Sequence, residues 1–201
     1  MTIKQVKNAA VVGSGTMGVG IAQIIVQNGF PAVLYDINEA QIFRAKQSIE
    51  KRLNRLVEKV RASKEEVEAA KKRLIVTTTL EDIHDVDLVI EAAPEKLEVK
   101  SSIFKQLESI CSKETIFATN TSSLSVTEIS VILQNPERLA GLHFFNPAPL
   151  MPLVEVVRGL HTSEKLINTL QEFALRVQKK PMFTTNRQNY EKCGWIQNGS
   201  I

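Results

Sequence analysis

Short apolar runs alternate with helical patterns along most of the chain. The runs are short enough to be buried strands, and apolar residues recur every three or four positions in the segments between them. This alternation favours right-handed crossovers and a doubly wound, mostly parallel α/β sheet. Six strands are predicted, followed by two that extend one edge: residues 9–13, 32–36, 74–78, 86–92, 115–119 and 139–144, then 153–158 and 182–185.

The segment between the second and third predicted strands is too long for a simple crossover. Its apolar positions keep helical spacing in two stretches, which the turn-like sequence Ala62-Ser63-Lys64 separates. Ser63 followed by Glu66 matches a capping box and marks the start of the second stretch. We therefore predict a helical hairpin inserted at residues 39–73.

The first strand runs directly into a glycine-rich turn, Gly13-Ser14-Gly15-Thr16-Met17-Gly18, and a helical pattern follows it. Gly13 suits the tight turn, Gly15 lets backbone approach a diphosphate, and Gly18 allows the helix to pack closely on the strand. The helix N-terminus then faces the phosphates with its free N–H groups. Taken alone, this spacing also fits an ordinary turn or a site for FAD or S-adenosylmethionine.

An acidic residue, Asp36, ends the second strand. A carboxylate there accepts hydrogen bonds from the adenosine ribose hydroxyls and repels a 2′-phosphate. Ile37 and Asn38 follow, so no arginine reverses that preference. Because strand, glycine turn, helix, second strand and acid come in the required order, we predict a Rossmann-type domain that binds NAD rather than NADP.

Composition excludes several other classes of protein. The chain has 201 residues, of which 43% are hydrophobic, and its net charge of +3 is too small to indicate nucleic-acid binding. Cys111 and Cys193 lack metal-ligand spacing. Neither an apolar signal core nor a run long enough for a membrane span is found in the sequence, so a cytoplasmic protein is expected.

Two polar blocks follow neighbouring strands, Thr119-Asn120-Thr121-Ser122-Ser123 and His143-Phe144-Phe145-Asn146-Pro147. In an open parallel sheet both blocks border the ligand crevice. If the strand at 153–158 returns antiparallel to its predecessor, Glu155 lies level with His143. A carboxylate on one ring nitrogen would leave the other free to take a proton from a secondary alcohol, although a histidine or glutamate in such a place is more often structural.

Further polar residues of these segments are candidates for the same crevice. The hydroxyls of Ser122 or Ser123 and the amide of Asn146 are placed to orient a substrate oxygen or the nicotinamide amide. Glu95 and Lys100, just after the fourth strand, are placed to contact the nicotinamide half of the cofactor. The alternative for Glu95 is an acid that stabilises a helix N-terminus.

In this order, the blocks resemble the NAD-binding domain of the 3-hydroxyacyl-CoA dehydrogenases. The resemblance covers residues 5–183, and the run Pro147-x-Pro149-x-Met151-x-Leu153-Val154-Glu155 is its most specific part. It implies reversible oxidation of a 3-hydroxyacyl-CoA to the 3-oxoacyl-CoA, with His143 as the base and Glu155 as its partner. It also implies the following contacts to NAD or substrate: Gly13 to Gly18, Asp36, Glu95, Lys100, Asn120, Ser122 and Asn146.

The same resemblance implies an acyl-CoA substrate lying along the helical hairpin. There Arg52 and Lys59 would contact the coenzyme A phosphates. The charge pattern alone instead favours a helix face that is simply exposed to solvent. A helical domain normally follows the NAD-binding domain in this family. It closes the substrate site and supplies dimer contacts, so a homo-oligomer or a separate helical partner is expected.

After Lys180-Pro181 the sequence departs from the family. We expect an NAD-binding domain at residues 1–184 and a divergent tail at 185–201, which reads as a truncated or frame-shifted end. Asn186-Arg187 matches a dipeptide of the family, but the residues around it differ. Counting forward without gaps from Lys180-Pro181, the position of the family's active-site asparagine falls on Cys193. An NAD-binding module without turnover therefore remains an alternative. Hydroxyacid dehydrogenases that use a lysine from a later helix are disfavoured by His143 and Glu155.

Overall fold

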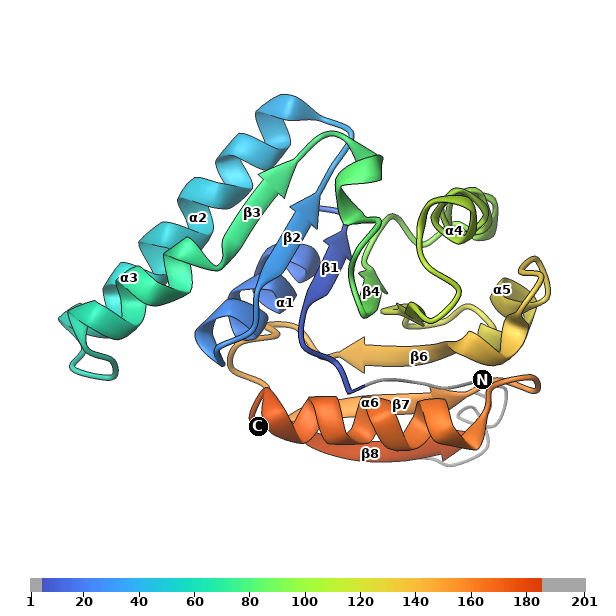
Figure 1. Ribbon diagram of the computed structural model, residues 1–201. Coiled ribbons are helices and arrows are strands. Elements are labelled where there is room, and N and C mark those ends of the chain that lie inside the picture. Colours follow the sequence, from blue (N-terminus) through green and yellow to red (C-terminus); the bar gives the residue numbers. More distant parts are fainter. Residues whose placement is uncertain (1–4, 186–201) are drawn as a thin grey trace.

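The computed structural model describes residues 5–185, which form an eight-stranded sheet with the order β3-β2-β1-β4-β5-β6-β7-β8 (Figure 1). Neighbouring strands are parallel except for β6 and β7, which are antiparallel. The predicted doubly wound, mostly parallel Rossmann-type sheet is confirmed.

The strands are β1 Ala9–Val12, β2 Ala32–Tyr35, β3 Leu74–Thr77, β4 Leu88–Glu91, β5 Ile116–Thr119, β6 Leu139–Phe144, β7 Leu153–Arg158 and β8 Lys180–Thr185. The helices are α1 Thr16–Gln27, α2 Glu39–Glu58, α3 Lys64–Lys72, α4 Leu97–Ile110, α5 Val126–Ser130 and α6 Glu164–Arg176, with 3₁₀ turns at Leu80–Ile83 and Pro136–Arg138. Most predicted strands are slightly longer than those observed, whereas β8 begins earlier than predicted.

Each face of the sheet has its own apolar core. One core contains α1, α6 and the inner faces of α2 and α3, with Ile21, Leu53 and Leu170 fully buried. The other contains α4 and α5, with Phe104 and Ile129 fully buried. The middle strands β1, β4 and β5 are buried along their whole length, which explains why they read as continuous apolar runs.

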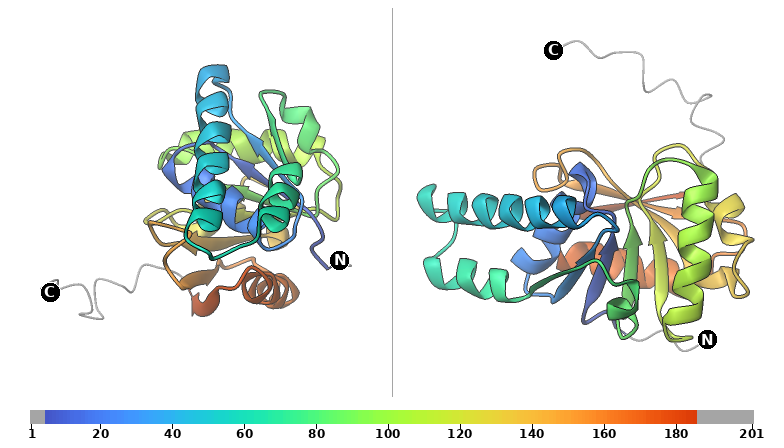
Figure 2. Two further views of the ribbon diagram at one scale, coloured as in Figure 1. Left: turned by 90° about the vertical axis from the view of Figure 1, so that its left-hand side faces the viewer. Right: turned by 90° about the horizontal axis from the view of Figure 1, so that it is seen from above.

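The predicted hairpin is formed by α2 and α3, which project past the β3 edge of the sheet (Figure 2). The capping box is present: Ser63 Oγ accepts from the Glu66 N–H, and the Glu66 carboxylate accepts from the Ser63 N–H. Asn38 caps α2 by accepting from the Gln41 N–H.

The sheet changes direction between β6 and β7. The proline-containing segment between them turns the chain back, and the antiparallel register pairs His143 with Glu155. The predicted return that aligns these two residues is therefore observed.

Among residues 5–185, no helix is long and apolar enough to cross a bilayer, and no cluster of potential metal ligands occurs. Cys111 is buried as a free thiol. The residues of the divergent tail discussed above, Asn186, Arg187 and Cys193, lie outside the described residues.

Candidate functional site

The glycine turn between β1 and α1 has the geometry that its sequence predicts. Gly13 has φ 104°, and a Cβ on it would stand 2.7 Å from the Ala92 carbonyl oxygen. A Cβ on Gly18 would stand 1.7 Å from the Gly13 oxygen, so this glycine is required by the fold itself. Gly15 differs, because a Cβ there would meet no described atom within 4 Å. The space over Gly15 is open, as a site for a diphosphate requires.

Asp36 is tied to the glycine turn. Its Oδ2 accepts from the Ser14 N–H at 2.8 Å and from Ser14 Oγ at 2.7 Å. Gln41 Nε2 also donates to that oxygen, at 3.1 Å. Ser14 therefore contacts the acid rather than projecting over the turn. Sequence reasoning missed Gln41, although its place in the first turns of the helix after Asp36 was a usable signal.

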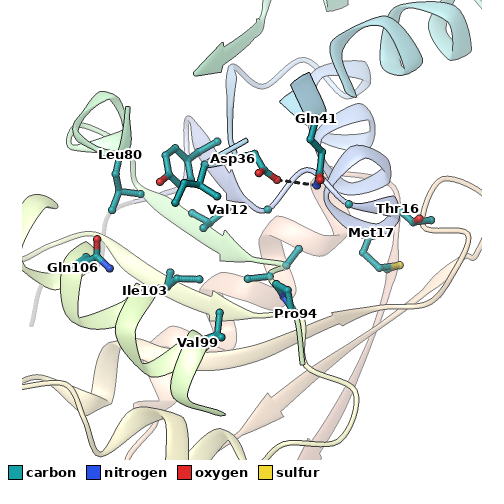
Figure 3. Close-up of a pocket in the computed structure, with 16 residues that line it drawn as sticks. Val12, Thr16, Met17, Asp36, Gln41, Leu80, Pro94, Val99, Ile103 and Gln106 are labelled. Atoms are coloured by element: carbon teal, nitrogen blue, oxygen red, sulfur yellow. Dashed lines mark hydrogen bonds between the residues drawn. The ribbon is translucent and has the colours of Figure 1, made fainter. Parts of the chain in front are cut away.

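A cavity of about 640 Å³ opens along the turn and Asp36 (Figure 3). Leu80, Ile103 and Gln106 lie at one end of it, Thr16 and Met17 at the other, and Asp36 with Gln41 between them. The mostly apolar lining at the Leu80 end suits the faces of a planar base. The cavity thus has the order that a dinucleotide needs: base, ribose acceptor, diphosphate turn.

A second cavity, of about 280 Å³, begins where the first one ends. Both are lined by Met17, Ala92 and Ala93, so they are neighbours. The second is also lined by the following residues: Glu95, Asn120, Ser122, His143, Phe144 and Asn146. The structure therefore brings together most of the side chains that the sequence assigned to the crevice.

His143 and Glu155 form a close pair at this cavity. His143 Nδ1 is 2.8 Å from Glu155 Oε2, and the two side chains are 15% and 6% exposed. The Phe145 ring packs against the imidazole, with ring centroids 4.7 Å apart. The pairing occupies Nδ1 and leaves Nε2 as the nitrogen able to exchange a proton with a ligand.

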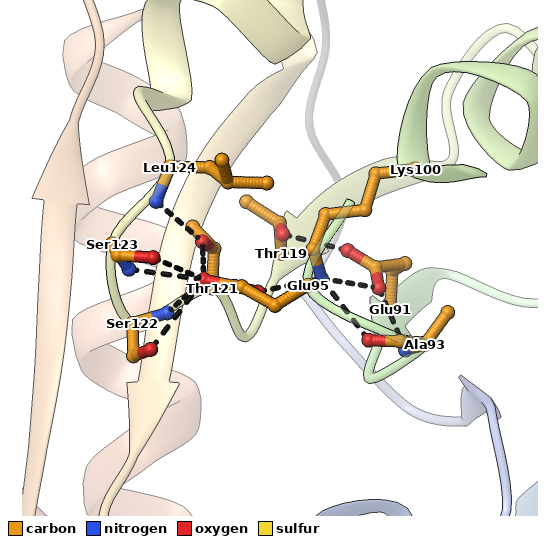
Figure 4. Close-up of polar contacts among 9 residues, drawn as sticks. All are labelled: Glu91, Ala93, Glu95, Lys100, Thr119, Thr121, Ser122, Ser123 and Leu124. Atoms are coloured by element: carbon orange, nitrogen blue, oxygen red, sulfur yellow. Dashed lines mark hydrogen bonds and ion pairs between the residues drawn. The ribbon is translucent and has the colours of Figure 1, made fainter. Parts of the chain in front are cut away.

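Glu95 holds the segment that follows β5 (Figure 4). Its Oε1 accepts from the Thr121 hydroxyl and from the N–H groups of Ser122 and Ser123 at 2.8 and 3.0 Å. Partial burial acts to raise the pKa of Glu95, but these hydrogen bonds and the charge of Lys100 outweigh it and lower the pKa to about 2. Glu95 precedes α4 and so is not an acid within the helix's first turn.

Lys100 lies behind Glu95 rather than in the open cavity. It is 1% exposed, and its Nζ is 2.7 Å from Glu91 Oε1 and 3.3 Å from Glu95 Oε2. Glu91 also accepts from Thr119 Oγ1 and the Ala93 N–H (Figure 4). Burial raises the pKa of Glu91. Sequence reasoning gave Glu91 no role, although an acid ending a wholly apolar strand was the signal available.

Asn120 joins the ends of β5 and β6. Its Oδ1 accepts from the Phe144 N–H at 2.8 Å, immediately after His143. Arg52 and Lys59, by contrast, belong to the hairpin, and neither lines the two cavities as described for residues 5–185. Their predicted contact with coenzyme A stays a prediction.

Comparison with known proteins agrees with this geometry. Residues 8–187 match the family described as "3-hydroxyacyl-CoA dehydrogenase, NAD binding domain". A 3-hydroxyadipyl-CoA dehydrogenase of Escherichia coli is 48% identical over 177 residues, which are 88% of this chain and 37% of that protein. A probable 3-hydroxybutyryl-CoA dehydrogenase of Bacillus subtilis is 40% identical, over 91% of this chain and 66% of that protein.

Solved structures show the same likeness. The 3-hydroxybutyryl-CoA dehydrogenase of E. coli superposes with a TM-score of 0.89 at 46% identity, covering 90% of this chain and 39% of that one. The corresponding enzyme of Ralstonia eutropha gives a TM-score of 0.88 at 35% identity, covering 90% and 64%. The chain thus spans only part of the length of these relatives. The open space over Gly15 and the acid at Asp36 fit NAD, the cofactor of this family. The chain belongs to the 3-hydroxyacyl-CoA dehydrogenase family, and what it contains is that family's NAD-binding domain.

Proposed function

We propose that this chain contributes the cofactor site and the proton-transfer pair of an enzyme that interconverts 3-hydroxyacyl-CoA and 3-oxoacyl-CoA. The names of its relatives, which act on 3-hydroxyadipyl-CoA and 3-hydroxybutyryl-CoA, support this substrate class. The observation that carries the proposal is the 2.8 Å contact between His143 Nδ1 and Glu155, made at the wall of the cavity that continues the dinucleotide site.

His143 acts as the general base in oxidation. Its Nε2 takes the proton of the substrate hydroxyl, and Glu155 stabilises the positive charge that the ring then carries. NAD, when bound, would accept the hydride that leaves the carbon bearing that hydroxyl. In the reverse direction the protonated ring returns the proton to the oxygen. Because Glu155 is nearly buried, its charge is little screened by water at that moment.

Ser122, Asn120 and Asn146 orient the ligands around this pair. Ser122 presents its hydroxyl on a segment that Glu95 fixes through two backbone N–H groups. Asn120 is fixed by its bond to the Phe144 N–H. Asn146 follows His143 in the sequence, whereas Asn120 and Ser122 precede it, and Asn146 lines the same cavity. Lys100 supports the arrangement through its contacts with Glu91 and Glu95.

The hairpin is proposed to lie along the coenzyme A portion of the substrate. The support is the basic character of α2 and the residue that follows it, where Arg52 and Lys59 are found. Charge pattern alone favours a solvated helix face, so the assignment also rests on the resemblance to the family. A chain lacking both cations should still bind NAD.

The test is an assay of NADH oxidation with acetoacetyl-CoA, run beside a titration with NADH and with ADP-ribose. We expect both ligands to bind, and NADH to be consumed only when acetoacetyl-CoA is present; free acetoacetate is the control for the coenzyme A portion. Binding of NADH without consumption would support the second candidate, an NAD-binding module that requires a helical partner. That candidate is favoured by the chain's spanning 37% and 66% of two curated relatives. If neither NADH nor ADP-ribose binds, both candidate functions are contradicted.

A further inference from the structure

The loop between β6 and β7 carries Asn146 into the second cavity, yet it is poor in hydrogen-bond donors. Pro147, Pro149 and Pro152 have no N–H group. The N–H groups of Leu150 and Met151 both donate to the Pro147 oxygen. Other carbonyls of the loop must therefore find a donor elsewhere in the protein.

Lys179, the residue just before β8, supplies that donor. Its Nζ donates to the carbonyl oxygens of Ala148 and Met151, both at 2.8 Å, and to that of Pro149 at 3.4 Å. An ammonium has three N–H donors, so these carbonyls use all of them. Lys179 is only 7% exposed, and burial lowers its pKa. A buried ammonium is costly, which argues that the contact has a purpose beyond surface solvation.

The backbone at the end of α6 directs Lys179 to this place. Gln178 has φ 59°, a left-handed turn after the helix, and the Lys179 N–H donates to the Ala174 oxygen at 2.9 Å. The next residue, Lys180, donates its N–H to the Pro152 oxygen and is itself exposed. Two adjacent lysines thus differ completely in environment.

Helix α1 limits the loop from the other side. A Cβ on Gly20 would stand 3.1 Å from Ala148 Cβ and from Pro149 Cδ, which is tighter than ordinary packing. The same helix begins at the glycine turn and carries Met17, which lines both cavities. The loop is therefore held between the helix that borders the diphosphate site and the ammonium of Lys179.

We propose that Lys179 is a positioning residue: by binding the carbonyls of Ala148 and Met151 against α1, it sets where Asn146 stands in the cavity next to His143. The consequence for the ligand rests on the proposed function: His143 exchanges the proton at that cavity, so the nicotinamide end of NAD must reach it. The adenosine and diphosphate end lies on the other side of Met17 and is independent of the loop.

The first experiment compares Lys179→Met with Lys180→Met by hydrogen exchange without ligand. Both variants remove one positive charge, but only the first removes the three carbonyl contacts. We expect faster exchange at the Leu150 and Met151 amides in Lys179→Met, with the β1 strand and the glycine turn unchanged, and no change in Lys180→Met. Equal protection of the loop in all three proteins would overturn the proposal.

The second experiment measures affinity for NADH, through its nicotinamide fluorescence, and for ADP-ribose, which lacks the nicotinamide. Lys179→Met should lower the affinity for NADH by about tenfold, as expected for the loss of hydrogen bonds from one charged group, and leave the affinity for ADP-ribose unchanged. An equal loss for both ligands, or for neither, would refute the positioning role. If the unmodified chain binds ADP-ribose but not NADH, the proposed function fails, while the exchange experiment still decides on the loop.

A second variant covers the case in which Lys179→Met fails to fold. Gly20→Ala displaces the loop from the α1 side and introduces a better helix former. This variant should lower the affinity for NADH but not the affinity for ADP-ribose. Unchanged affinity for NADH in a folded Gly20→Ala protein would contradict the proposal independently of Lys179.

Discussion

The two adjoining cavities are built in different ways. The larger one has its ribose and diphosphate end in a contiguous β-α-β unit, from Gly13 to Asp36, and most of the remaining, largely apolar lining comes from Leu80, from the segment after β4 and from α4. The smaller one collects residues from separate strand ends, joined by contacts such as Ser122 to Glu95 and Phe144 to Asn120, which are 27 and 24 residues apart. Most of its polar side chains are held by hydrogen bonds. We therefore expect backbone shape to govern cofactor binding and a side-chain network to govern the proposed chemistry.

This contrast predicts that binding and turnover can be damaged separately. Substitutions in the glycine turn should affect every ligand that contains the diphosphate. Substitutions around His143 should affect only steps that involve the substrate or the nicotinamide.

The largest effect is expected from His143→Gln. A glutamine can still donate to Glu155 but cannot act as a base, so acetoacetyl-CoA-dependent NADH oxidation should fall by about 1,000-fold. Affinity for ADP-ribose should stay within about twofold, because no contact of the larger cavity changes. His161→Gln, at an exposed histidine after β7, is the matched control and should retain full activity. Normal turnover in His143→Gln would remove the basis for the proposed base.

Next in size is the effect of Gly15→Ala on binding. The added methyl group meets only the space over the turn, so the protein should fold normally and lose about 100-fold in affinity for NADH and ADP-ribose alike. Gly18→Ala is the comparison, since its Cβ overlaps the Gly13 oxygen at 1.7 Å. That variant should also lower the thermal unfolding midpoint. Isothermal titration and a melting curve for each variant separate the two cases; tight binding by Gly15→Ala would mean that the diphosphate lies elsewhere.

A smaller effect is expected from Asp36→Asn. The amide oxygen can still accept from the Ser14 N–H, but the negative charge that repels a 2′-phosphate is gone. Affinity for NADH should fall by about tenfold, and the preference for NADH over NADPH should shrink by a similar factor. Competition titrations measure both. Asp85→Asn, exposed before β4 at the far end of the sheet, serves as the control. A cofactor preference that does not change would show that another group selects the ribose.

The smallest effect concerns the stability contributed by Glu95. Its pKa is lowered in the folded protein from 4.5 to about 2, so its stabilising effect is present at neutral pH and is lost as the pH falls through that range. Between pH 5 and pH 2 the unmodified protein should lose more unfolding free energy than Glu95→Gln, by about 1 kcal/mol at most, because the carboxylate is partly exposed to water. Denaturant titrations across this window give the difference. Glu98→Gln, in the exposed first turn of α4, should behave like the unmodified chain. Parallel pH curves for Glu95→Gln and the unmodified chain would refute the role of Glu95.

Local sequence patterns were sufficient for most of the fold. The glycine turn, the acid after β2 and the Ser63 capping box act through neighbouring residues, so their geometry follows from their spacing. The pairing of His143 with Glu155 was also predictable, because a short connection between two strands implies an antiparallel return. Gln41 and Glu91 had local signals that were overlooked, whereas Lys179 was not found because its role depends on carbonyl groups of the β6–β7 loop, which only the folded chain brings against it.

By itself, then, the sequence determined the order of strands and helices, the dinucleotide turn and the alignment of His143 with Glu155. Periodicity and short-range steric rules encode such features directly. Only the tertiary structure decided that Lys100 is buried between Glu91 and Glu95, that Glu95 holds the Ser122 segment, and that Lys179 supports the Asn146 loop. The physical reason is that a buried charge must find partners, and those partners come from segments that meet only when the sheet is assembled.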